Sequence, residues 1–207
     1  MTSDARVHRP LVVLLVAVGL VLVVAEGRAQ APPRRSLAGR LLVATDAIRD
    51  PRFVRTVIYL ARHSEEGALG FVINVPMGEV PFERVLKPLG VEAPPGSGNL
   101  QVHYGGPVEP GQGFVLHTPD WKGEGTLVIN THFALSEDPK VLQAMARGSG
   151  PRRALFCLGY AGWAPGQLDA ELDRGSWGIA PADEKLVFDE DPKVKWIEAT
   201  ARRLLDL

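Results

Sequence analysis

The sequence predicts a single α+β domain with a mixed, largely antiparallel sheet and flanking helices. Short apolar runs rich in β-branched residues follow one another along the middle of the chain, with glycine-rich or proline-rich turns between them. Segments with helical periodicity are interspersed among these runs, and no internal repeat is visible. The 207 residues are 45% hydrophobic and 23% charged, which is an ordinary globular composition with enough apolar residues for one sizeable core.

The N-terminus differs from the rest of the chain. A basic end at residues 6–9 precedes an apolar run at residues 11–25, and the motif Ala-Gln-Ala follows at residues 29–31. A basic end, an apolar segment and small residues at −3 and −1 are the order of a cleavable secretory signal. The apolar run is shorter than the roughly 20 residues that span a bilayer, which favours a cleaved signal peptide at residues 1–31 over a membrane anchor.

An uncleaved single-pass anchor stays open because Glu26 and Arg28 stand close to the cleavage position. Residues 32–36 have the composition of a linker, and residues 37–207 form the predicted domain. We expect an exported, periplasmic protein that meets the membrane only through its N-terminal segment if that segment is uncleaved. A cytoplasmic location follows if the start of translation is misassigned.

Charge and cysteine content exclude several functions. Three of the 23 basic and two of the 24 acidic side chains lie in residues 1–31, so the remaining chain carries a net charge of −2. This balance does not favour a phosphate backbone, and no helix-turn-helix or basic stripe is visible, so nucleic-acid binding is not expected. The single Cys157 excludes an internal disulfide framework and a cysteine-rich zinc module.

The first half of the domain is predicted to begin with strands. Residues 40–44 form the first, and the apolar runs at residues 57–61 and 69–75 form a hairpin with its turn at Gly67. Both hairpin runs are apolar on successive residues, which indicates that both faces are covered. Apolar residues at helical spacing then predict a short amphipathic helix over residues 82–89.

The second half mixes both kinds of element. Three strands are predicted at residues 102–104, 113–117 and 126–133, arranged as an antiparallel meander, and Ser136 is predicted to cap the helix that follows. Later elements are predicted as a strand at 154–158, a helix at 165–174, a short strand at 186–188, and a terminal helix with the apolar stripe Val194, Ile197, Ala201 and Leu204.

No complete catalytic or metal-binding motif is present. Four histidines follow the leader, and none of them pair at HxH, HxxxH or HExxH spacing: His63, His103, His117 and His132. No metal or other cofactor is therefore expected. Cys157 has apolar neighbours and no nearby cation to lower its pKa, which indicates a core thiol and not a nucleophile.

The run Gly105-Gly106-Pro107 predicts a tight turn, because adjacent glycines tolerate backbone conformations with positive φ. Such a turn can present backbone N–H groups to an anionic ligand. Simple reversal of the chain between two strands is the alternative interpretation.

Four segments in order carry a family pattern. They are Asp-Pro-Arg-Phe-Val-Arg-Thr-Val-Ile-Tyr-Leu at residues 50–60 with His63, Gly-Ala-Leu-Gly-Phe-Val-Ile-Asn at 67–74, Gly-Gly-Pro-Val at 105–108 with Gly-Phe-Val-Leu-His at 113–117, and Gly-Tyr-Ala-Gly-Trp at 159–163 with Pro-Gly-Gln-Leu at 165–168, Glu171 and Trp177. Together they span about residues 37–200, and in this order they resemble the YqgE/AlgH family of bacterial proteins.

The resemblance implies an α+β domain with a bifurcated sheet that curls toward a pseudo-barrel. It implies no established catalytic activity or cofactor, and the family is named partly for a proposed transcriptional regulator of alginate biosynthesis. The positions it marks for a ligand or partner site are His63, Asn74, Gly105, Gly106, His117, Trp163, Gln167, Glu171 and Trp177. The structural alternative is that these residues close the sheet ends and seat the helix at 165–174, since buried polar groups must be paired.

One departure from the family concerns anion binding. Val75 stands where relatives commonly carry a basic residue after the Ile-Asn pair, so an anion contact at that position is not expected.

Three hypotheses about function follow. The first is a non-catalytic binding or regulatory module in the cell envelope, which recognises a small ligand or an envelope protein through the glycine-rich turn and the region from Trp163 to Trp177. The second is a hydrolase or transferase that uses His63 or His117 as acid or base near Glu171, which requires these side chains in one cleft. The third is a transcriptional regulator, if the chain is cytoplasmic.

Overall fold

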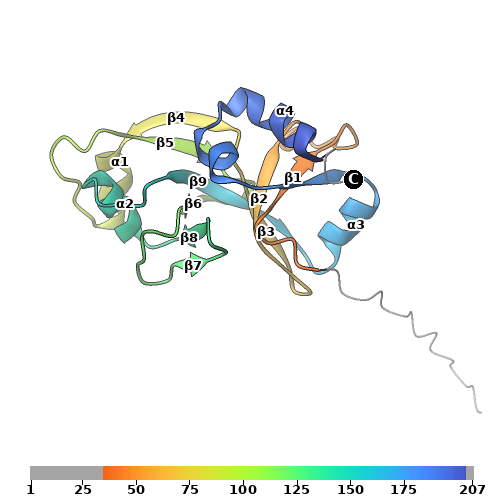
Figure 1. Ribbon diagram of the computed structural model, residues 1–207. Coiled ribbons are helices and arrows are strands. Elements are labelled where there is room, and N and C mark those ends of the chain that lie inside the picture. The colour runs from red at the N-terminus through yellow and green to blue at the C-terminus, as the bar shows by residue number, and fades with distance from the viewer. Residues whose placement is uncertain (1–34, 204–207) are drawn as a thin grey trace, which may run out of the picture. The chain divides into compact units, whose positions relative to one another are not determined.

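A mixed sheet of ten strands organises the described part of the chain, residues 35–203, in the computed structural model (Figure 1). The strands are β1 (Arg40–Ala44), β2 (Val57–Ser64), β3 (Gly67–Val72), β4 (Pro76–Pro81), β5 (Asn99–Tyr104), β6 (Val108–His117), β7 (Leu127–Val128), β8 (Ala134–Ser136), β9 (Ala154–Trp163) and β10 (Trp177–Pro181). The helical segments are α1 (Phe82–Leu86), the 3-10 turn η1 (Lys87–Leu89), α2 (Pro139–Ala146), α3 (Gln167–Asp173), the π-helical turn η2 (Lys185–Asp189) and α4 (Pro192–Arg203). This architecture confirms the predicted α+β class. The predicted leader at residues 1–31 lies outside the described residues.

Strand β9 is shared by two branches of the sheet. Its residues 161–163 pair with β3, and its residues 156–158 pair in parallel with β5 on the same edge. Strand β6 pairs along the opposite edge. The sheet is therefore bifurcated, as the family resemblance implies, with α1 and α2 at one end of β9 and α3 at the other (Figure 1). The remaining strand pairs of the described residues are antiparallel.

The chain crosses β9 at residues 105–107, because β5 and β6 lie on opposite edges of that strand. The Gly105 N–H donates to the Leu158 carbonyl at 2.8 Å, so it faces the sheet and not solvent. A Cβ on Gly106 would lie 2.2 Å from the Tyr160 carbonyl carbon, and the residue has φ +155°. Only glycine fits such a close approach. The predicted meander and simple strand reversal are thus both wrong, since this segment crosses over a strand.

The first hairpin follows the prediction. Strands β2 and β3 pair antiparallel, and the turn places Gly67 at φ +126°. Tyr59 belongs to one buried cluster, whereas its neighbours Ile58 and Leu60 belong to another. Both faces of β2 are therefore covered, as the consecutive apolar residues predict.

Two local predictions are wrong because an aspartate starts a helical turn at each of the two places. Helix α2 is capped by Asp138, whose carboxylate accepts from the Lys140 N–H at 2.8 Å, and Pro139 fits the first helical position. Ser136 lies instead in β8. The predicted strand at residues 186–188 is part of the helical turn η2, because the Asp183 carboxylate accepts from the Leu186 N–H at 2.8 Å and starts a turn there.

Helix α4 does not bury the part of the predicted apolar stripe at residues 194–201, and Leu204 lies outside the described residues. Its buried residues are Lys195 and Ala199, whereas Ile197 is 59% exposed. The Lys195 ammonium donates to the carbonyls of Ile73 at 3.2 Å and Val187 at 2.6 Å. Burial lowers the pKa of Lys195 to about 8. A buried lysine of this kind, which bonds α4 to the residue after β3 and to η2, cannot be recognised from apolar periodicity.

Candidate functional site

Glu171 of α3 is the centre of a side-chain network at one end of the sheet. Its Oε2 accepts hydrogen bonds from the indole N–H groups of Trp163 at 2.9 Å and Trp177 at 2.8 Å. Its Oε1 accepts from the Gln167 amide at 2.9 Å, and the Gln167 oxygen accepts from the Ala164 N–H at 3.1 Å. The carboxylate is thus held by three side-chain donors, which fixes both oxygens.

The local sequence explains why these groups meet. Trp163 is the last residue of β9 and Trp177 the first of β10, so the short helix α3 between the two strands lies beside both indoles. Gln167 and Glu171 are one turn apart on that helix and share a face. The two indoles pack edge to face at 6.1 Å, and Phe53 packs on Trp177 in the same way at 5.9 Å.

A cavity of about 390 Å³ opens beside this network. One wall is the loop at residues 47–53, and the other comes from the end of β9, from α3 and from the start of β10. Pro107, at the chain crossing, completes the lining. The volume falls in the range of small-molecule sites, and the mixture of aromatic walls with a few fixed polar groups is typical of them.

The cavity lining contains more positive than negative side chains. Arg49, Arg52 and Arg174 line it together with the carboxylates of Asp50 and Glu171. The Arg52 guanidinium donates to both oxygens of Asp50, with Nε to Oδ1 at 3.0 Å, and this contact lowers the pKa of the Asp50 carboxyl. Arg52 also lies 5.8 Å from the centre of the Phe53 ring. Sequence reasoning missed this loop as a wall of the site, although the first family segment begins within it.

His63 contacts α3 near Asp169 and is not part of the cavity lining. Its Nδ1 accepts a hydrogen bond from the Leu37 N–H at 3.1 Å, and its carbonyl accepts from the Ser36 hydroxyl at 2.8 Å. Its Nε2 is 3.9 Å from an Asp169 oxygen. His63 therefore fastens the start of the described chain to the domain next to α3.

Asn74 holds the backbone at the end of β3. Its side-chain oxygen accepts from the Val57 N–H and its amide donates to the Arg55 carbonyl, each at 2.9 Å. Arg55 has φ +55°, and Asn74 supports that turn. With Gly105 and Gly106, which form the crossing, Asn74 serves the backbone, as the structural alternative expects.

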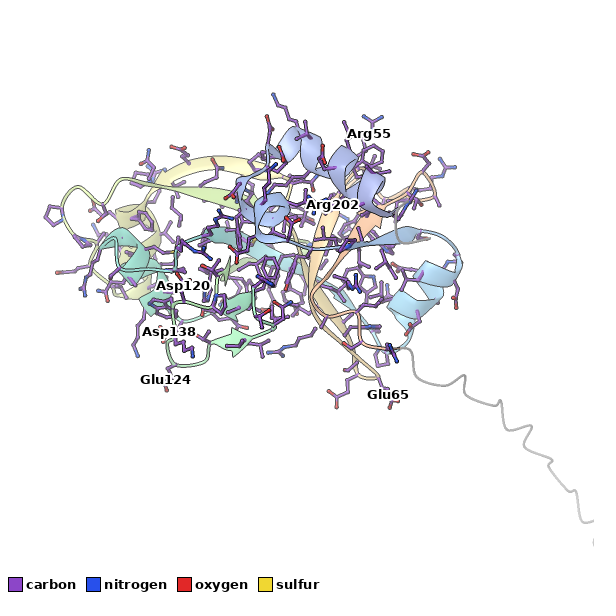
Figure 2. All side chains as sticks on the ribbon, viewed as in Figure 1. Arg55, Glu65, Asp120, Glu124, Asp138 and Arg202 are labelled. Atoms are coloured by element: carbon purple, nitrogen blue, oxygen red, sulfur yellow. The ribbon has the colours of Figure 1, made fainter. Side chains whose placement is uncertain are left out.

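His117 is sealed at the other end of β9, opposite Ala154. Its Nδ1 contacts the Thr118 carbonyl at 2.7 Å and its Nε2 contacts the Ser136 hydroxyl at 2.9 Å. Burial lowers the pKa of His117, which keeps the imidazole neutral. The neighbouring Asp120 accepts from the Arg152 N–H at 3.0 Å at this end of the molecule (Figure 2).

The structure does not bring His117 and Glu171 into one cleft. His117 is opposite the first residue of β9, and Trp163, which contacts Glu171, is the last. Nine residues of extended strand separate these levels by roughly 30 Å, since a strand rises about 3.3 Å per residue. The pairing of His117 with Glu171 as acid and base is therefore not supported by the geometry.

Residues 35–203 contain neither a cluster of metal-ligating side chains nor a membrane-spanning helix. No group of three or more His, Cys, Asp and Glu side chains is placed to hold a metal ion there. In the same part of the chain, no helix is long and apolar enough to cross a membrane.

The fold and the site together define an α+β protein with a bifurcated sheet and an aromatic cavity walled by a fixed carboxylate. A sequence profile described as AlgH-like matches residues 41–207. The chain belongs to this family.

Similar proteins agree with this assignment. A UPF0301 protein of Rhodospirillum rubrum is 46% identical over 170 residues, covering 82% of this chain and 88% of the relative, and a UPF0301 protein of Gluconobacter oxydans is 45% identical over 165 residues, covering 79% and 88%. The solution structure of the AlgH protein from Pseudomonas aeruginosa matches with a TM-score of 0.72 and 39% identity, covering 84% of this chain and 92% of that one. A crystal structure from Corynebacterium diphtheriae, at 23% identity and a TM-score of 0.61 with 79% and 85% coverage, shares the fold.

Proposed function

We propose that the protein is a non-catalytic binding module that takes a small ligand in the cavity beside Glu171. The observation that carries the proposal is the carboxylate held by two indoles and an amide at the edge of an open cavity. A wall fixed in this way is preorganised, so a ligand does not have to order it on binding. Aromatic surfaces next to fixed polar groups supply both contact area and orientation.

The bonding of the polar groups favours binding over catalysis. A carboxylate offers about four lone-pair positions, and three of those on Glu171 already accept hydrogen bonds from protein donors. His63 uses Nδ1 for the Leu37 N–H and directs Nε2 toward Asp169. A general base needs free lone pairs within reach of the substrate. His63 does not line the cavity, and about one acceptor position is left on Glu171, so most of this carboxylate serves to hold the cavity wall.

The four tryptophans provide a direct test of this proposal. In a heteronuclear NMR spectrum of the purified protein, each indole N–H gives one signal, and Trp163 and Trp177 report on the cavity. Trp196 donates to the Ala44 carbonyl at 2.9 Å, and Trp121 packs on His117, so both serve as internal controls. A library of small fragments is expected to yield compounds that shift only the cavity pair.

A matched pair of variants makes the test specific. Trp177→Phe removes one indole from the cavity, whereas Trp196→Phe removes one outside it. Binding of the hit compounds should weaken in the first variant and persist in the second. The proposal fails if a diverse library gives no compound that shifts the cavity pair, or if hits shift Trp121 and Trp196 equally.

We also propose that this module works in the cell envelope, on the basis of the order of basic, apolar and small residues at positions 6–31. Expression of the full-length chain followed by fractionation and N-terminal sequencing tests this. A soluble periplasmic product that begins at Pro32 is the expected result. A cytoplasmic product would contradict export and favour the regulator hypothesis.

A further inference from the structure

We infer that the cavity beside Glu171 is selective for a small organic anion, a carboxylate or a phosphate monoester attached to a planar apolar body. This inference rests on the proposed binding function and specifies its ligand. The lining contains five charged side chains, which differ in the hydrogen bonds and ion pairs that they make with other protein groups.

Both carboxylates of the lining are already occupied. Asp50 receives the Arg52 guanidinium and the Arg52 backbone N–H, the latter at 3.0 Å. Glu171 receives the two indoles and the Gln167 amide. The donors to Glu171 are neutral, so they leave its charge in place but occupy three of its roughly four acceptor positions, whereas Arg52 is committed to Asp50 in the same loop.

The other two cations of the lining have no such neighbour. Arg49 in the loop and Arg174 at the C-terminal cap of α3 form no ion pair with any carboxylate of residues 35–203. They come from segments far apart in the chain and line the same cavity. An arginine recognises a carboxylate or a phosphate through two parallel N–H donors, and two such side chains around one cavity favour an anionic ligand.

The apolar part of the lining selects the rest of the ligand. Trp177 meets Trp163 and Phe53 edge to face, so aromatic surface borders the cavity beside the two cations. Flat groups gain most from such walls because they stack or pack edge to face. The Ser176 hydroxyl, which also lines the cavity, adds a neutral donor.

The test compares three probes with the same naphthyl body: 2-naphthoate, its neutral isostere 2-naphthamide, and 2-naphthyl phosphate. Each is titrated into the purified protein while the indole signals of Trp163 and Trp177 are followed. We expect at least one of the two anions to bind about tenfold or more tightly than the amide, since a charge-assisted contact is stronger than a neutral one. Comparison of the two anions tells whether a carboxylate or a phosphate is preferred.

Variants separate the arginines from general charge effects. Arg49→Gln and Arg174→Gln should each weaken binding of the preferred anion by about tenfold and leave binding of the amide unchanged. Arg84→Gln, on the exposed face of α1, changes the net charge equally and should have no effect. Denaturation midpoints of the three variants should match the parent protein, because Arg49 and Arg174 form no ion pair within residues 35–203.

Two outcomes overturn the inference. If the amide binds as tightly as both anions, the site is not anion-selective, although the proposed binding function stands. If none of the three probes shifts the cavity signals while neutral compounds of the fragment library do, the ligand class is wrong and the binding function again stands. Only the failure of the whole library removes both.

Discussion

The polar side chains at the two ends of β9 lie in different surroundings. At the end that carries Trp163, which we call the cavity end, Glu171 and its three donors lie beside an open cavity. At the end that carries residues 154–158, which we call the closed end, His103 and His117 are 5% and 0% exposed. Neither histidine lines the cavity beside Glu171.

This difference separates two reasons for which a protein keeps a polar residue among apolar ones. At the closed end, His117, Ser136 and Thr126 bond to one another in a chain with contacts of 2.9 Å, and His117 and Ser136 are almost completely buried. Such a network specifies packing. At the cavity end the network is equally complete but borders a cavity that the exposed Arg49 and Arg174 also line, and the proposed ligand binding depends on this cavity.

The chain crossing joins the two ends, and its removal should have the largest effect. Gly106→Ala places a Cβ 2.2 Å from the Tyr160 carbonyl carbon, so either the crossing or β9 must move. We expect a loss of about 4 kcal/mol or more in the free energy of unfolding, or failure to fold. Urea denaturation measures it.

Gly111→Ala is the matched control, since a Cβ there meets nothing within 4 Å. It should change stability by less than about 0.5 kcal/mol. Equal midpoints for the two variants would mean that the crossing is not sterically closed and that the two ends are less tightly joined than the contacts indicate.

Acid is expected to destabilise the protein through the buried histidines of the closed end. Burial lowers the pKa of His103 from 6.5 to about 4, so between these values the unfolded chain binds more protons than the folded one. Stability is therefore complete above about pH 6.5 and falls as the pH is lowered toward 4, by up to about 3 kcal/mol for this residue. His117, whose pKa is also lowered by burial, acts in the same direction.

Urea denaturation at a series of pH values checks this dependence. His103→Leu should flatten the slope between pH 6.5 and 4, because the titrating group is removed. A slope that is unchanged in the variant would assign the acid sensitivity to other groups.

Glu171→Gln tests the cavity end. The new amide oxygen still accepts from the indoles, but the amide nitrogen faces the Gln167 amide, so two donors meet. We expect a loss of about 1–2 kcal/mol and a change in the Trp163 and Trp177 indole signals. Glu65→Gln, at the tip of the β2–β3 hairpin (Figure 2), is the control and should do neither. Unaltered indole signals in Glu171→Gln would contradict the network.

The smallest effect concerns Cys157 at the closed end. The thiol is fully buried, and burial raises its pKa to about 12. A thiol reagent at neutral pH should leave the native protein unlabelled over hours and label it at once in concentrated guanidinium chloride. Rapid labelling of the native protein would show that this end opens.

The sequence predicted elements whose signals are local. The first strand agrees with Arg40–Ala44, and the helix predicted at residues 165–174 agrees with α3 at Gln167–Asp173. Strand β4 was not predicted because it begins and ends with proline, yet an edge strand tolerates proline at its ends. The cap predicted at Ser136 is two residues too early, because Asp138 caps α2 with Pro139 at the first helical position.

Long-range pairing accounts for the rest. The placement of His117 depends on the register of β6 against β9, and nothing in either segment records that register. Residues 47–53 and α3 line the same cavity, although most of the domain sequence lies between them. Arg49 and Arg174 therefore could not be linked from sequence, although the tryptophans and Glu171 could.

The pairing of β1 with β10 also determines the order in which the protein matures. The first strand of the domain, Arg40–Ala44, has its neighbour on one edge at Trp177–Pro181, and closing a loop of that length costs about 4 kcal/mol of chain entropy. During translation, β1 can therefore pair with β10 only after residue 181 has been synthesised. Trp177, which donates a hydrogen bond to Glu171, belongs to the same late segment. The nascent chain is thus without its cavity until the last fraction of translation, and the proposed ligand binding requires the chain up to residue 181.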